Sequence, residues 1–209
     1  MLPSPLQRGL FDSAEPGFDP DLAQARRTWL DGGAWIEHAP AWLSGHEAVL
    51  EALWTTTRWH AQRRRMYDRD VDVPRLVATL PEDGPGHPIL LRLAAALAAR
   101  YGRALPSVSL AAYRDGRDSV AFHGDRLGIH RDDAIVAIVS LGEARRFLLR
   151  PAGGGPSRAF APGGGDLLVM GGTCQRTWEH AVPKVARAGL RISVQFRSSG
   201  EGDGAPPAP

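Results

Sequence analysis

Three side chains that commonly bind metal ions stand in two short segments of the chain. His123 and Asp125 are separated by one glycine, and His180 follows much later, after Trp178-Glu179. In an extended strand, residues i and i+2 point to the same face, so His123 and Asp125 can bind one ion together. Two His and one carboxylate hold three positions of a non-haem Fe(II) ion and leave three open. The alternative is a chance pairing, because His-x-Asp occurs in many proteins without a metal.

A second pattern lies in the last apolar segment, which alternates without a break from Arg191 to Arg197. It begins 11 residues after His180. One face of such a strand is apolar, and the other carries Arg191, Ser193, Gln195 and Arg197. The polar face either meets solvent or, if the strands close into a barrel, lies near the metal. Arginine binds carboxylates through two parallel hydrogen bonds, so a short dicarboxylate is a sensible ligand, although i and i+6 lie about 20 Å apart on a straight strand.

Composition excludes several other kinds of chemistry. Lys and Arg total 25, of which one is Lys184, leaving 24 Arg. No Gly-Lys-Ser/Thr triplet exists, so a phosphate-binding P-loop is excluded. The single Cys174 excludes an internal disulfide and a multi-thiolate metal site.

The sequence also bears on where the protein acts. A single cysteine suits a reducing cytoplasm. No apolar run approaches the roughly 18 residues of a membrane span, and no secretory signal is visible, so we expect a cytoplasmic protein without a membrane partner.

Helices are expected early in the chain and strands later. The spacing predicts helices over Asp21–Leu30, Ser44–Trp54 with Ser44 as N-cap, and Ile89–Tyr101, with an extended piece over Trp35–Trp42. From residue 107 onward, short runs between Gly and Pro predict a β-sandwich or barrel, with strands at 108–113, 118–124, 134–141, 145–150, 166–171 and 190–197. Two adjacent arginines, Arg145 and Arg146, either reach the site or sit on a strand edge.

These motifs, taken in order, resemble those of the AlkB-type Fe(II)/2-oxoglutarate-dependent dioxygenases. The resemblance covers roughly residues 60–197. Besides the metal and arginine patterns, it is carried by four segments: Tyr113-Arg114-Asp115-Gly116, the run Gly165–Gly172, Met66-Tyr67 and Pro74-Arg75-Leu76.

The resemblance implies an α+β, β-dominated fold with a double-stranded β-helix (jelly-roll) core and N-terminal helices packed on one side. With it we expect a helical N-terminal part with a nucleotide-recognition region (21–106) and a catalytic core (107–197). Composition adds an irregular arm (1–20), with four prolines and no apolar periodicity, and a disordered tail (198–209) without large apolar side chains.

It also implies roles for individual residues. Iron and catalysis would rest on His123, Asp125 and His180, with 2-oxoglutarate and O2 as cosubstrates. The 2-oxoglutarate site would use Arg191 for the distal carboxylate, with Tyr113, Ser193, Gln195 and Arg197. The substrate region would include Met66, Tyr67, Arg75 and Met170.

The implied activity is oxidative dealkylation of N-alkylated bases in DNA or RNA, in alkylation damage repair, by a monomer. Bases would be reached in single strands or by flipping. Four positions depart from the family pattern: Ala111 replaces an Asn that binds the cosubstrate, Ser193 and Gln195 stand where Asn and Thr are often found, and Leu127 replaces an acidic residue near the base. Two alternatives remain: a 2-oxoglutarate-dependent hydroxylase of a protein or small molecule, and a non-catalytic nucleic-acid-binding module with a degenerate site.

Overall fold

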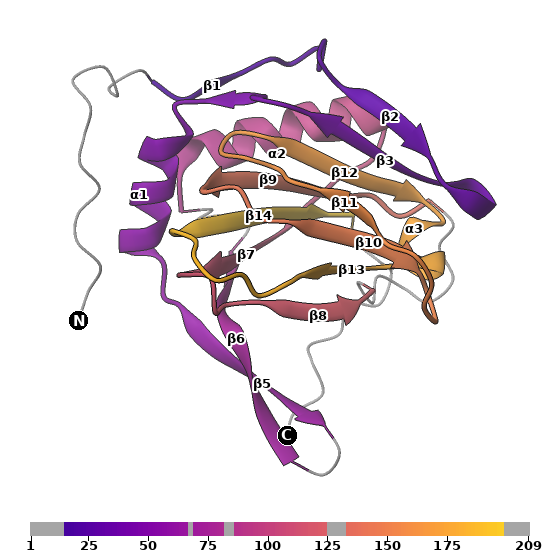
Figure 1. Cartoon of the computed structure of the whole chain (residues 1–209). Helices are drawn as coiled ribbons and strands as arrows, with labels where there is room; N and C mark the ends of the chain where they lie inside the picture. The colour runs from indigo at the N-terminus through magenta and orange to yellow at the C-terminus, as the bar shows by residue number, and fades with distance from the viewer. Residues whose placement is uncertain (1–14, 67–68, 82–85, 125–132, 199–209) are drawn as a thin grey trace.

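The computed structural model describes residues 15–66, 69–81, 86–124 and 133–198, with the backbone alone for residues 62–66 and 69–72. Its largest element is an antiparallel sheet of eight strands (Figure 1). In spatial order these are β2 (Arg26–Trp29), β3 (Ala34–Ala39), β12 (Leu167–Gly172), β9 (Val136–Gly142), β14 (Arg191–Arg197), β7 (Ser107–Tyr113), β6 (Arg69–Leu80) and β5 (His60–Met66).

Two smaller sheets and a few helices complete the described part of the chain. A four-stranded sheet contains β11 (Arg158–Phe160), β10 (Phe147–Pro151), β13 (Trp178–Val182) and β8 (Val120–His123), in that order. A short ladder joins β1 (Gly17–Phe18) to β4 (Leu43–Ser44). The helical elements are η1 (Asp31–Gly33), α1 (His46–Thr56), α2 (Pro88–Tyr101) and α3 (Cys174–Thr177). Within the described residues, no helix has the length and apolar character needed to cross a membrane.

The eight-stranded sheet separates two apolar layers. On one face, apolar residues of α1 and α2 pack against inward-facing residues of β7, β9, β12 and β14. On the other face, residues of β3, β7, β9 and β12 pack against β8, β10 and β13 of the four-stranded sheet. We call this second layer the inter-sheet layer. Two antiparallel sheets packed face to face, with helices on one outer side, form the jelly-roll arrangement that the sequence led us to expect.

The helix α2 shows how local sequence fixes an element. Its N-cap His87 accepts a hydrogen bond at Nδ1 from the Ile89 N–H, and Pro88 occupies the first helical position, where a missing N–H costs nothing. Gly102 ends the helix in the left-handed conformation that glycine adopts without strain. The apolar stripe of α2 is buried against the sheet, so the predicted helix over Ile89–Tyr101 is confirmed.

Two other expectations for this part of the chain are wrong. Residues 21–30 form no helix; instead Arg26–Trp29 is the edge strand β2, paired with β3. The second predicted helix exists as α1, but its N-cap is Gly45, because Ser44 belongs to β4 and its Oγ donates a hydrogen bond to the Gly17 carbonyl.

The segment 21–106 contributes strands as well as helices to the fold. Besides α1 and α2, it supplies β2, β3, β5 and β6 to the same sheet as the later strands. The extended piece expected over 35–42 is realised as β3, and all six later strands that the sequence predicts are present. The hairpin of β5 and β6 extends away from the body of the two sheets (Figure 1).

Candidate metal and anion site

The two predicted histidine ligands lie next to each other on neighbouring strands of the four-stranded sheet. His123 of β8 pairs with His180 of β13, and their ring centroids are 4.4 Å apart. The next pair, Val120 with Val182, is three residues away on β8 but two on β13, which marks a β-bulge in β8. Residues three apart on a regular strand point to opposite faces, so the bulge allows both Val120 and His123 to face inward.

Contacts with neighbouring groups hold each imidazole in a defined orientation. His180 is 7% exposed and stacks on the Phe147 ring. His123 Nδ1 lies 2.8 Å from the Ala121 carbonyl oxygen. Because a carbonyl oxygen only accepts, Nδ1 carries the proton and the lone pair lies on Nε2, the form in which an imidazole binds a metal.

The third predicted ligand, Asp125, lies outside the described residues. Within the described part of the chain, no group of three His, Cys, Asp or Glu side chains is placed to hold a metal ion. The pair of histidines therefore fits a metal with nitrogen ligands, and Asp125, two residues after His123, stays the predicted source of the carboxylate.

The polar face of β14 points into the inter-sheet layer, because Ile192, Val194 and Phe196 pack on the helix side. Arg191 is 1% exposed, and its Nη2 donates a hydrogen bond to Ser140 Oγ at 2.9 Å. Among the described residues its guanidinium has no carboxylate partner, and its Nε has no acceptor. A buried cation without a counter-ion is costly, so this position suits an anionic ligand.

Burial lowers the pKa of Arg191, and the positive charge of Arg145 lowers it further, whereas Tyr113 opposes both. An arginine keeps its charge at neutral pH even with a lowered pKa. Burial is the largest cause of this shift, and among the described residues no acidic side chain contacts the guanidinium. A carboxylate ligand would supply a balancing charge.

Tyr113 lies at the centre of three guanidinium groups. Its ring centroid is 5.3 Å from the Arg191 guanidinium carbon and 5.6 Å from that of Arg145. Arg75 Nη1 donates to the Tyr113 hydroxyl at 3.5 Å. The structure thus brings Arg75, which the sequence placed in the substrate region, to the residue predicted to bind the cosubstrate.

The other predicted cosubstrate residues lie further along β14. Ser193 is buried and pairs with Ala111 and Ser140 on the two neighbouring strands. At the end of the strand, Arg197 donates hydrogen bonds to Gln195 Oε1 and Ser109 Oγ. Roles of these residues in binding 2-oxoglutarate stay predictions.

The substrate residues are less fully described. Met170 is fully buried in the inter-sheet layer, together with Tyr113. The Met66 side chain and Tyr67 lie outside the described residues, as does Leu127. For all of them the substrate role stays a prediction.

Sequence reasoning could not assign Arg145. It is buried, whereas its neighbour Arg146 is exposed. The sequence pattern alone does not show which of two adjacent arginines before a strand is buried and which is exposed. Phe147 and Ser140 were also missed, because an apolar residue and a serine within strands are typical of any sheet.

The chain is similar to members of a known protein family. A family model described as the 2OG-Fe(II) oxygenase superfamily matches residues 20–197. The alpha-ketoglutarate-dependent dioxygenase alkB homolog 3 of Bos taurus is 29% identical over 174 residues, covering 73% of this chain and 61% of the relative. The DNA oxidative demethylase ALKBH2 of Arabidopsis thaliana is 32% identical over 120 residues, covering 46% of this chain and 38% of the relative. Both matches thus cover less than two thirds of the relative's own length.

Solved structures show the same fold at low identity. An oxidoreductase of the 2OG-Fe(II) oxygenase family from Burkholderia pseudomallei superposes with a TM-score of 0.56 at 20% identity, covering 80% of this chain and 86% of that one. The structure of OsALKBH1 gives 0.57 at 13% identity, covering 83% of this chain and 100% of that one. These likenesses confirm the β-dominated jelly-roll. The chain belongs to the 2OG-Fe(II) oxygenase superfamily as an AlkB-like member, and this membership implies Fe(II), 2-oxoglutarate and O2.

Proposed function

We propose that this dioxygenase oxidatively dealkylates N-alkylated bases in DNA or RNA, with His123, Asp125 and His180 as iron ligands. The observation that carries the proposal is the adjacent pair of His123 and buried His180, on the sheet that packs against the face of β14 carrying Arg191, a buried cation with no carboxylate partner among the described residues. Imidazoles supply the metal ligands, and the guanidinium supplies the site for a carboxylate of the cosubstrate.

In this proposal each residue of the site has a separate role. Arg191 binds the distal carboxylate of 2-oxoglutarate, and Ser140 and Tyr113 hold the guanidinium in place. Ser193, Gln195 and Arg197 continue the polar face along β14. Bound Fe(II) supplies the O2 activation that couples conversion of 2-oxoglutarate to succinate and CO2 with hydroxylation of the N-alkyl carbon. Loss of a hydroxymethyl group as formaldehyde then restores the base.

Nucleic acid as the substrate is supported by the relatives' names and by the chain itself. One relative is named a DNA oxidative demethylase. The protruding β5–β6 hairpin contains Arg63-Arg64-Arg65 next to Met66-Tyr67, a sequence suited to contacts with phosphates and bases. Met66, Tyr67, Arg75 and Met170 are the proposed substrate residues. We further propose that the protein acts as a monomer in the cytoplasm, in alkylation damage repair, on single-stranded or flipped bases.

Two measurements test this function. Anaerobic addition of Fe(II) and 2-oxoglutarate should produce a weak visible charge-transfer band, which His123→Ala should abolish. Succinate release should then be measured across a panel of methylated DNA and RNA oligonucleotides, with mass spectrometry of the bases. Loss of methyl groups in step with succinate release supports the proposal.

The same panel separates the alternatives. Turnover of 2-oxoglutarate without any demethylated base would contradict a nucleic-acid substrate and favour a hydroxylase of another molecule. Salt-dependent binding of oligonucleotides without a band and without succinate would contradict the enzyme and favour a binding module.

A further inference from the structure

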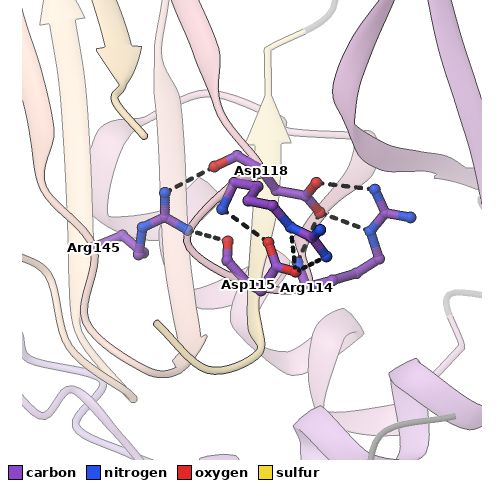
Figure 2. A network of polar contacts seen from close by, with 5 residues as sticks. Arg114, Asp115, Asp118 and Arg145 are labelled. Carbon is purple, nitrogen blue, oxygen red and sulfur yellow. Dashed lines mark hydrogen bonds and ion pairs between the residues drawn. The ribbon is translucent and has the colours of Figure 1, made fainter. Parts of the chain in front are cut away.

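Arg145 lies between β9 and β10 and is 2% exposed. Its guanidinium donates three hydrogen bonds to backbone carbonyl oxygens. Nη1 bonds the Asp115 carbonyl at 2.9 Å, and Nη2 bonds those of Asp118 at 2.8 Å and Pro183 at 2.9 Å. Figure 2 shows the Asp115 and Asp118 contacts, together with the neighbouring Arg114–Asp118 ion pair.

These three carbonyls belong to the segments that adjoin β7, β8 and β13, the strands of Tyr113, His123 and His180. Asp115 and Asp118 lie between Tyr113, the last residue of β7, and β8, which ends at His123. Pro183 directly follows β13, which contains His180. One side chain therefore ties together the segments next to both histidines and the tyrosine.

Further contacts show that the segment between β7 and β8 lies directly against the segment after β13. The Val185 N–H donates to the Gly116 carbonyl at 2.8 Å. A Cβ at Gly116 would overlap the Val185 carbonyl oxygen, so the approach requires glycine. Asp118, itself buried, accepts hydrogen bonds from the backbone N–H and the guanidinium of Arg114, which fixes the turn from within.

The charge of Arg145 also acts at the predicted cosubstrate site. Its three acceptors are uncharged carbonyls, and the described residues offer it no carboxylate. Its guanidinium and that of Arg191 both lie within 6 Å of the Tyr113 ring centroid, at 5.6 Å and 5.3 Å. Arg145 and Arg191 therefore place two buried positive charges beside the Tyr113 ring, and a carboxylate bound at Arg191 would offset part of their repulsion.

We propose that Arg145 is a positioning residue for 2-oxoglutarate: it fixes Tyr113 and the histidine-bearing strands through three carbonyls, and its charge strengthens the binding of the distal carboxylate at Arg191. Arg145 itself touches no cosubstrate. This inference rests on the proposed function, because it assumes that the anion at Arg191 is 2-oxoglutarate.

The test uses Arg145→Met, Arg145→Lys and the exposed neighbour Arg146→Met as the matched control. Calorimetry with the Mn(II)-loaded protein gives the Kd for 2-oxoglutarate and for 2-oxopentanoate, which has the same chain length and lacks the distal carboxylate. We expect Arg145→Met to raise the Kd for 2-oxoglutarate about 10- to 100-fold, the usual effect of losing a residue that orients ligand groups. The Kd for 2-oxopentanoate should rise much less, and Arg146→Met should change neither.

Hydrogen exchange tests separately whether the three carbonyl hydrogen bonds of Arg145 hold the segments together. The Val185 amide should exchange faster in both Arg145 variants, because a single ammonium cannot replace a planar fork that bonds three carbonyls. Arg145→Lys keeps the charge, so it should retain the preference for 2-oxoglutarate over 2-oxopentanoate. It also provides the test if Arg145→Met does not fold.

The outcomes separate this inference from the function on which it rests. If the wild-type protein binds 2-oxoglutarate and Arg191→Met does not, while the Arg145 variants behave like Arg146→Met, the inference is wrong and the function stands. An equal loss of affinity for both ligands in Arg145→Met also overturns it, because that result indicates general damage to the site. If the wild-type protein binds neither ligand, the proposed function fails and the inference fails with it.

Discussion

The rings of Phe147 and His180 lie nearly parallel, with centroids 5.2 Å apart and an angle of 16° between their planes. Phe147 is the first residue of β10, and it is buried in the inter-sheet layer. Strand β13, which contains His180, lies between β10 and β8. Phe147 of β10 therefore stacks on the His180 ring from one side, and His123 of β8 lies on the other. A metal ligand held in this way loses little conformational freedom when the ion binds.

Phe147→Leu should therefore weaken metal binding without unfolding the protein. The substitution keeps an apolar side chain and should cost no more than about 1.5 kcal/mol of unfolding free energy. Loss of the stack releases the His180 ring, so Mn(II) affinity, measured by electron paramagnetic resonance, should fall about tenfold. Phe160→Leu is the matched control, because Phe160 pairs with Phe147 across β10 and β11. Equal Mn(II) affinity in both variants would show that the stack does not hold the ligand.

Arg191→Met should separate stability from function. The guanidinium is buried and has no carboxylate partner among the described residues, so its removal relieves an unbalanced charge. The lost hydrogen bond to Ser140 offsets part of that gain. We expect an unfolding free energy within about 1 kcal/mol of the wild type, or higher. The rise in melting temperature on adding 2-oxoglutarate, by contrast, should disappear. A variant that is strongly destabilised yet keeps this rise would contradict both parts.

The sequence predicts elements well where local pattern decides them. The alternation of Arg191–Arg197 and the apolar stripe of Ile89–Tyr101 each reflect a single buried face. It fails where a distant partner decides. Arg26–Trp29 becomes a strand because it pairs with β3, and Ser44 is drawn into a ladder with Gly17. Neither partner is visible in the local spacing.

The sequence predicts the residue types of the candidate site but not the contacts that support them. The His-x-Asp spacing assumes a regular strand, whereas β8 contains a bulge between Val120 and His123 that spacing alone does not reveal. Arg145 acts on carbonyls of residues 27 to 38 positions away. Carbonyls are present at every residue, so such a partner leaves no trace in side-chain types.

Gly116→Ala should weaken the site through the backbone. A methyl group there overlaps the Val185 carbonyl oxygen, so the connection between β7 and β8 must move away from the segment after β13. We expect a lower melting temperature and a higher Kd for 2-oxoglutarate. Gly163→Ala is the matched control, since a Cβ at Gly163 meets no atom within 4 Å. Equal behaviour of the two variants, measured by thermal unfolding and calorimetry, would show that the close approach at Gly116 is unimportant.

Asp166 should make the fold sensitive to acid. Burial is the largest single effect on its pKa and raises it, but hydrogen bonds from the Ala41 N–H, His38 and the Gly163 N–H together hold the pKa below the ordinary value. A carboxyl group with a lowered folded-state pKa stabilises the fold fully above its unfolded-state pKa, near 3.8, and loses this effect as the pH falls through the folded-state pKa. Urea unfolding of the wild type and Asp166→Asn should therefore differ most at about pH 5 and above, and the two should converge as the pH drops below about 3.8. A constant difference across this range would mean that the Asp166 charge does not stabilise the junction of β3 and β12.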